Sequence, residues 1–197
     1  MDGAELFSKC LALATGVVKQ VRPEHYANAT PCADWHVGDL LDHLLGELRV
    51  VPKLLAGENV EATTDEDENG ENVVDETDIE LSANWQATAD AAEAAGNEAD
   101  PDEIIHSARG DVSIDSYLRQ VATDLLVHAW DLAVAIGMPL AVAPDVSLAV
   151  YNDALSSDRA LLPDDAATVP LAVAEKAAPQ TKLLARYGRS PDWRAAG

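Results

Sequence analysis

The chain has 197 residues, of which 48% are hydrophobic, and carries 35 acidic against 13 basic residues, a net charge of −22. A field of that sign repels nucleic acid and anionic membrane surfaces, so we expect neither as a partner. The length fits one domain with a small appendage, and a core of Ala, Leu and Val with few aromatic residues is typical of closely packed helices. So acidic a surface is also compatible with a high-salt cytoplasm, where ions screen self-repulsion.

The sequence contains no feature typical of export or membrane insertion. Its two cysteines, Cys10 and Cys32, are too few for a disulfide framework and are expected to be free thiols. The first residues, MDGAELFSK, are acidic where a signal peptide is basic. The longest apolar run, Leu132–Pro144, is interrupted by Gly137 and Pro139. We therefore expect a cytoplasmic protein.

Two helices are predicted in the first third of the chain. The first begins at Asp2, which starts a capping-box pattern, and its apolar periodicity continues to Arg22. The second is predicted over Val37–Leu55. His43 lies on that helix beside an apolar face, where a single histidine is more often a hydrogen-bonded boundary residue than a ligand.

The acidic stretch Glu58–Glu80 follows, and its high charge and low hydrophobicity favour a solvated connection between helices. Asp65–Glu76 satisfies the D-x-D-x-N-G-x5-E pattern of a calcium loop, but no helix is evident before it. Calcium binding therefore stays an open alternative to the solvated loop. A third helix is predicted over Ser82–Ala95, with Trp85 as its main packing residue.

A fourth helix is predicted over Tyr117–Gly137, capped by Ser113 or Asp115. Before it, Ile104–Ser107 and Asp111–Ile114 could pair as a hairpin, although the pattern favours an ordered loop.

One stripe of the fourth helix carries the strongest chemical signal. At about 100° per residue it collects Tyr117, Val121, Asp124, His128, Asp131 and Ala135. Carboxylates and an imidazole on a core-facing stripe are costly to bury unless something compensates them. Asp124 and His128, four residues apart, could both reach one cation. A buried histidine hydrogen-bonded to a carboxylate, with no metal, explains the same spacing, so the stripe leaves both alternatives open.

Short elements are predicted in the last quarter of the chain. A helix over Asp145–Leu155 is followed by the irregular, proline-interrupted stretch Leu161–Pro179. A last helix covers Pro179–Tyr187 and is closed by Gly188. No internal repeat or glycine-rich nucleotide motif is present.

Three segments, TPCADWHVGDLLDHLLGE, GDVSIDSYLRQVATDLLVHAWDLAVAIG and PQTKLLARYGRSPDW, together resemble the metal-binding branch of the DinB-like superfamily. That superfamily contains mycothiol-dependent maleylpyruvate isomerase. The resemblance implies an all-α, four-helix bundle over residues 1–140, with a short helical extension packed on it over residues 141–197. It further implies a divalent metal held by His43, Asp124 and His128. Asp131 is then either a hydrogen-bond acceptor that orients a ligand imidazole or a plain structural partner between helices.

The chain also departs from its relatives. The resemblance places a Glu of the isomerase at the position of Asp124, so the substrate of that enzyme is not carried over to this chain. His36 stands where relatives tend to carry Thr or Ser. Histidine is a weaker helix cap than these residues by ~0.5–1 kcal/mol, and the His36 side chain is expected to face solvent. Cys32 is expected to anchor its loop rather than bind metal, and Trp35 and Trp130 are expected to be packing residues.

The donor set and the resemblance predict a function. Two histidines and one carboxylate leave coordination positions open, which is typical of catalytic zinc, although nickel, iron and manganese accept the same ligands. A metal-stabilised low-molecular-weight thiol would add to a small electrophile, as in an isomerase or S-transferase. The alternatives are a non-enzymatic metal- or thiol-binding stress protein and a helical dimerisation domain with a vestigial site. Related bundles often look dimeric, so a homodimer is compatible with the resemblance.

Overall fold

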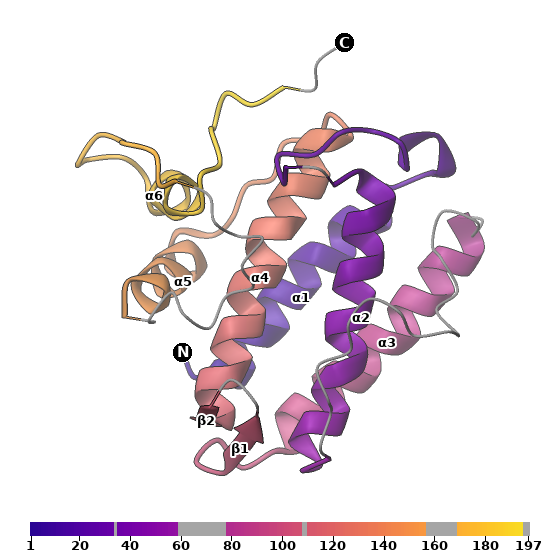
Figure 1. The fold of residues 1–197 in the computed structure, drawn as a ribbon, viewed down its shortest axis with the longest axis vertical. Coiled ribbons are helices and arrows are strands. Elements are labelled where there is room, and N and C mark those ends of the chain that lie inside the picture. The colour runs from indigo at the N-terminus through magenta and orange to yellow at the C-terminus, as the bar shows by residue number, and fades with distance from the viewer. Residues whose placement is uncertain (34, 59–77, 108–109, 157–168, 195–197) are drawn as a thin grey trace.

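The computed structural model describes residues 1–33, 35–58, 78–107, 110–156 and 169–194 (Figure 1). These residues are mostly helical, so the predicted all-α fold is confirmed. The elements are α1 (Gly3–Val18), the short 3-10 helix η1 (Pro23–His25), α2 (Val37–Leu55), α3 (Asp78–Glu98), β1 (Ile104–Ser107), β2 (Gly110–Ser113), α4 (Ile114–Ala135), α5 (Pro144–Ser156) and α6 (Pro179–Arg186).

The first two helices begin where the sequence predicts. The Asp2 carboxylate accepts a hydrogen bond from the backbone N of Glu5 at 2.8 Å and caps α1. α1 ends at Val18 rather than Arg22, because i→i−3 bonds tighten the chain beyond it into a turn. α2 has the predicted bounds, and Gly57 beyond its end has a φ of +73°, the left-handed conformation that commonly terminates helices.

α3 is longer than predicted at both ends. It begins at Asp78, so residues 78–80 belong to a helix and not to the acidic connection. Buried Leu81 and Trp85 anchor it, and the Trp85 indole N–H donates to the Thr15 hydroxyl at 2.9 Å. The calcium-loop pattern at Asp65–Glu76 lies outside the described residues.

The segment before α4 is a hairpin, and our preference for an ordered loop was wrong. β1 pairs antiparallel with β2, with Ile105 opposite Val112 and Ser107 opposite Gly110. Ile105 is buried, so its side of the strand faces the core. Gly110 adopts a φ of +120° at the turn, a conformation that favours glycine. The Ser113 hydroxyl accepts from the backbone N of Ser116 at 3.2 Å, so α4 starts three residues earlier than predicted.

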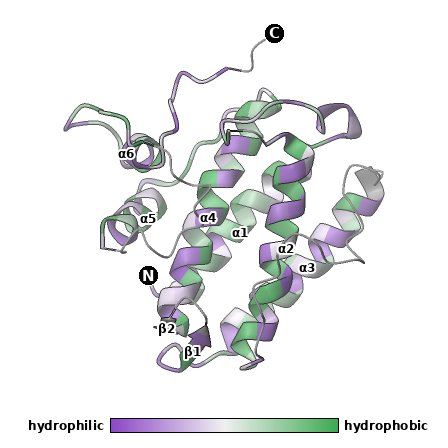
Figure 2. Cartoon of the chain, in the orientation of Figure 1, coloured by the Kyte–Doolittle hydropathy of each residue, from purple (hydrophilic) through white to green (hydrophobic). Residues whose placement is uncertain are grey.

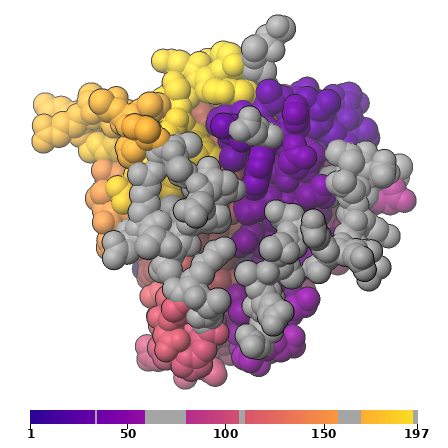
Figure 3. Space-filling view, viewed as in Figure 1, coloured from indigo at the N-terminus to yellow at the C-terminus, as the bar shows by residue number. Residues whose placement is uncertain are grey.

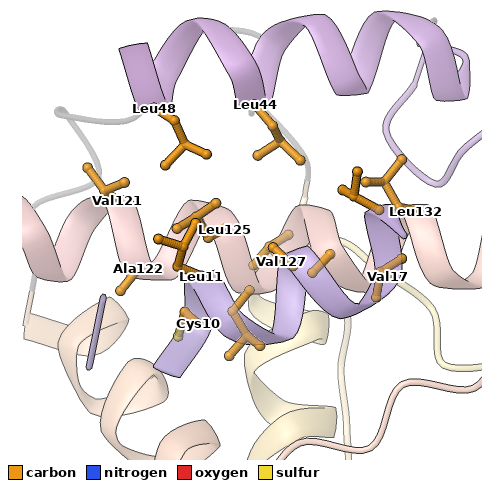
Figure 4. Packing of buried hydrophobic residues seen from close by; sticks show 14 of the residues in the cluster. Cys10, Leu11, Val17, Leu44, Leu48, Val121, Ala122, Leu125, Val127 and Leu132 are labelled. Carbon is orange, nitrogen blue, oxygen red and sulfur yellow. The ribbon is translucent and has the colours of Figure 1, made fainter. Parts of the chain in front are cut away.

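The four long helices share one core. α1 and α2 each contact both α3 and α4, so the four pack in a closed ring. Figure 4 shows leucines from three of them pointing at one another, including Leu11 of α1, Leu44 and Leu48 of α2, and Leu125 of α4. Figure 2 shows the apolar residues concentrated in stripes along these helices. Burying each leucine contributes roughly 1.5–3 kcal/mol, so this interior holds α2 and α4 in a fixed register.

α5 and α6 lie outside this ring. α5 packs on α4 and α1, and α6 packs on α5. Each lies within one residue of its predicted bounds, and residues 169–178 contain no helix, as expected. A domain boundary at residue 140 stays a prediction. Among the described helices, none has both the length and the apolarity needed to cross a bilayer.

Candidate metal centre

The site lies between α2 and α4, towards the end where α2 begins and α4 finishes (Figure 1). The chain between α1 and α2 covers this end, where the Asn28 side chain donates to the Ala135 carbonyl at 3.0 Å. The end of α4 is therefore held against the chain that precedes α2.

His43, Asp124 and His128 meet at this end of the helix pair. One ligand atom from each lies within 4.8 Å of the other two. His43 Nε2 is 3.3 Å from Asp124 Oδ2, and His128 Nε2 is 3.3 Å from Asp124 Oδ1. Each oxygen of one carboxylate thus faces one imidazole. The fold brings together the i, i+4 pair of α4 and a histidine 81 residues earlier in the chain.

Burial and charge act in opposite directions on these groups. Burial alone would raise the pKa of Asp124, but the charges and hydrogen bonds of His128 and His43 hold that pKa well below its usual range. Burial alone would lower the pKa of His128, but Asp124 and then Asp131 raise it to about 10. His43 follows the same pattern, and its pKa is also raised. In the ion-free protein the His128 ring therefore keeps a proton at neutral pH, and a cation would have to compete with it.

The donor set fits a divalent ion. Two imidazole nitrogens and one carboxylate oxygen are ligands that zinc accepts, and three protein ligands leave positions open. The side chains of His43, Asp124 and His128 are 19%, 24% and 11% exposed. The site is therefore largely enclosed, with the carboxylate as its most accessible member.

Asp131 lies behind His128 and not beside the other ligands. Its Oδ2 is 3.1 Å from His128 Nδ1, the nitrogen that faces away from Asp124. The same carboxylate, which is fully buried, accepts from Arg189. One side chain therefore contacts an imidazole of α4 and also pairs with an arginine of the C-terminal segment.

Arg189 was missed by the sequence analysis. Its Nη2 donates to Asp131 Oδ2 at 2.8 Å, its Nε lies 3.2 Å from both carboxylate oxygens, and its Nη1 donates to the Tyr187 carbonyl at 2.8 Å. Arg189 is 3% exposed, in a chain with few basic residues. Asp131 lies on a core-facing stripe, and a buried carboxylate needs a cationic partner. That need was the one signal in the sequence that pointed to a buried arginine or lysine.

Arg189 also brings the C-terminal segment to the loop before α2. Burial would lower the pKa of the Arg189 guanidinium, but Asp131 and, more weakly, Cys32 raise that pKa above its ordinary value. The contribution of Cys32 shows that the guanidinium lies near the loop before α2. Figure 3 shows yellow atoms of the C-terminal segment reaching the indigo-to-violet chain that precedes α2. Two segments distant in sequence therefore meet beside the site.

Trp35 forms a wall of the site. Its ring centroid is 4.8 Å from that of His43, and its plane is nearly parallel to the His128 ring at 6.2 Å. The Thr30 hydroxyl donates to the carbonyls of Trp35 at 2.9 Å and Cys32 at 3.1 Å, which fixes this loop. Trp35 is a packing residue, as expected, but it packs on the two candidate ligands.

The remaining candidates lie outside the three-residue group that the described residues form. The His36 side chain is exposed, as expected, and its backbone N donates to the Asp39 carboxylate at 2.8 Å. Cys32 is half-buried, and its backbone N donates to the Thr30 hydroxyl. Trp130 is buried, consistent with a packing role.

The molecule is thus an all-α protein with two histidines and one aspartate converging between adjacent helices. A family model for the mycothiol maleylpyruvate isomerase N-terminal domain matches residues 8–133, and the chain belongs to that family. The matched region contains all three candidate ligands and ends before Arg189.

Curated relatives and solved structures agree with this membership. Two uncharacterized proteins of Mycobacterium tuberculosis, MT0763 from strain CDC 1551 / Oshkosh and Rv0738 from strain ATCC 25618 / H37Rv, are each 25% identical over 146 residues, covering 74% of this chain and 71% of the relative. Crystal structures of mycothiol-dependent maleylpyruvate isomerase and of a histidine-to-alanine variant superpose with TM-scores of 0.61 and 0.62 at 14% identity. They cover 77% of this chain, which spans only 65% of the isomerase, so the likeness establishes the fold.

Proposed function

We propose that this protein holds a divalent metal ion through His43, Asp124 and His128. We further propose that, with a low-molecular-weight thiol, it acts as an isomerase or S-transferase on a small electrophile. The observation that carries the proposal is the convergence of three ligand atoms within 4.8 Å of one another in a member of the mycothiol maleylpyruvate isomerase N-terminal domain family. Zinc is the favoured ion, and nickel, iron and manganese are compatible with the same ligands.

The chain's own residues give such a site a defined orientation. His128 contacts Asp131 through Nδ1, so its Nε2 is the nitrogen left to face Asp124. The Trp35 ring lies beside both imidazoles, tilted against His43 and nearly parallel to His128. Asp124 supplies the negative charge that offsets part of a cation's charge and is the most accessible of the three.

The chemistry assigned to the site needs no protein nucleophile. A divalent ion, when bound, stabilises the thiolate of a coordinated thiol at neutral pH. The Cys10 thiol is fully buried, and burial raises its pKa to about 12, so it does not compete as a nucleophile. The thiol in this proposal comes from solution, in keeping with a family named for mycothiol.

The test is metal content and thiol-dependent turnover measured on the same purified protein. We expect about one zinc per chain and a reaction with small electrophiles, such as conjugated keto acids, that requires both zinc and mycothiol. A His43→Ala variant should lose both. A His106→Ala variant, whose histidine also pairs with a carboxylate, at 2.9 Å, but lies exposed on the hairpin, should keep both. Metal binding without turnover of any electrophile would instead support a non-enzymatic metal- or thiol-binding protein.

A further inference from the structure

The C-terminal segment reaches the candidate ligands through an unbroken series of polar contacts. The Arg189 guanidinium binds both oxygens of the Asp131 carboxylate, and that carboxylate contacts Nδ1 of His128. Arg189 and Asp131 are 3% and 0% exposed, so water does not screen these contacts. The series starts in a part of the chain that the matched family region does not include.

Two features make the position of the guanidinium depend on its own segment. Nη1 of Arg189 donates to the Tyr187 carbonyl, so the planar fork is fixed relative to the backbone that carries it. The backbone N of Arg189 donates to the Leu184 carbonyl at 2.9 Å, which ties that backbone to the end of α6. The place of the Asp131 carboxylate, and with it the orientation of the His128 ring, is therefore set from outside the four-helix core.

We propose that Arg189 is a positioning residue which, through Asp131, holds the His128 ring with Nε2 facing the metal position, so that docking of residues 187–189 and metal binding reinforce each other. The inference rests on the proposed metal site. Coupling between two binding events is reciprocal, so the factor by which docking raises metal affinity is the factor by which the metal strengthens docking. α6 itself is anchored independently by buried Leu183 and Leu184, so a change at Arg189 leaves that helix in place.

The first measurement is zinc affinity of the full chain by competition with a chromophoric chelator. Arg189→Lys keeps the charge but loses the fork, and we expect it to bind zinc about tenfold more weakly, in line with the usual effect of residues that orient a metal-bound histidine. Arg194→Met is the matched control, because Arg194 is exposed in the same segment and donates to the carbonyl of the neighbouring Trp193. It should bind zinc as the wild type does.

Removing Arg189 alone takes the arginine partner from a fully buried carboxylate and can prevent folding. The double variant Asp131→Asn/Arg189→Met removes both charges and keeps the fold testable. We expect it to unfold cooperatively and to bind zinc about ten- to a hundredfold more weakly than the wild type. Wild-type affinity in both Arg189→Lys and the double variant would overturn the inference while leaving the proposed function intact.

The second measurement is a readout that a purely structural arginine would not affect. Zinc should slow amide hydrogen exchange at Gly188 and Arg189, whose N–H groups donate to Ala185 and Leu184, by about the same factor as the affinity lost in the double variant. In the double variant zinc should leave this exchange unchanged. Unchanged exchange in the zinc-loaded wild type would overturn the coupling, and failure of the wild type to bind zinc at all would overturn the proposed function together with the inference.

Discussion

Two of the histidine–carboxylate contacts among the described residues are similar in length but lie in different surroundings. His106 and Asp111 face each other at 2.9 Å on the hairpin, with side chains 78% and 65% exposed. His128 and Asp124 are 3.3 Å apart, with side chains 11% and 24% exposed, and His43 and Asp131 contact the same pair. Distance does not distinguish the two. Burial and the number of partners do, because only the enclosed carboxylate has two imidazoles to satisfy.

The largest expected effect comes from removing a ligand at the enclosed site. His128→Ala should weaken zinc binding by at least about a hundredfold, because one of three protein ligands is lost. Zinc competition measures this directly. An affinity within threefold of the wild type would mean that the enclosed cluster is only a hydrogen-bonded network, no different in kind from the hairpin pair.

Acid should weaken metal binding strongly. The pKa of His128 is raised to about 10, so at neutral pH an ion must displace a proton from that ring, and the pKa of His43 is also raised, so acid adds a second competing proton. Zinc affinity should therefore rise by at least about tenfold per pH unit between pH 6 and 8, and level off only as the pH approaches the raised pKa of His128. Competition assays at several pH values give the slope, and a slope near zero contradicts the assignment.

Asp124→Asn preserves the shape of the carboxylate and removes its charge. We expect zinc binding on the order of ten- to a hundredfold weaker, with little change in the circular dichroism of the protein. Unchanged affinity would transfer the third ligand position to Glu47, which lies one turn after His43 and contributes to raising its pKa. Asp131 is the poorer candidate because Arg189 already binds it.

A smaller effect is expected at a carboxylate of intermediate burial. Asp115 accepts from the backbone N of Gly3 at 2.6 Å and from Arg119 Nε at 2.6 Å, and so ties the amino terminus to α4. Burial would raise the pKa of Asp115, but these partners lower it. Asp115→Asn should cost about 1–2 kcal/mol of unfolding free energy at pH 7. Because a lowered pKa stabilises the fold only above the ordinary carboxyl pKa, the difference should shrink as the pH falls below about 4.

The smallest effect is expected on the hairpin. His106→Ala and Asp111→Ala should each change the unfolding free energy by less than about 0.5 kcal/mol, because an exposed pair is screened by water and salt. Denaturant melts measure this. A loss above about 1 kcal/mol in either variant would mean that contact length matters more than burial in this protein.

Sequence reasoning succeeded where local rules decide the outcome. The bounds of α2 follow from apolar spacing and a terminating glycine, and the Asp124–His128 pair follows from helical periodicity. His43 was joined to that pair only by the family resemblance, because periodicity cannot say which helices become neighbours.

Long-range contacts and short elements were out of reach of the sequence. Arg189 lies 58 residues from Asp131, and its pairing depends on how the C-terminal segment folds back. The hairpin was predicted only as the less favoured alternative, because strands of four residues carry little periodic signal. The start of α3 was not predicted because its first turn is acidic and resembles the charged connection before it. Leu81, which is buried, is the first apolar anchor of this helix in the core.

The position of Trp35 beside the two imidazoles gives the protein an intrinsic optical probe. Its indole is a fluorophore within 6.2 Å of both ring centroids, and the loop that carries it is fixed by the Thr30 hydroxyl. Trp85, another of the four tryptophans, lies in the core, where its indole N–H donates to the Thr15 hydroxyl. A paramagnetic ion such as cobalt or nickel, placed among these ligands, would sit close enough to quench Trp35 emission, so occupancy can be followed by light without attaching a label.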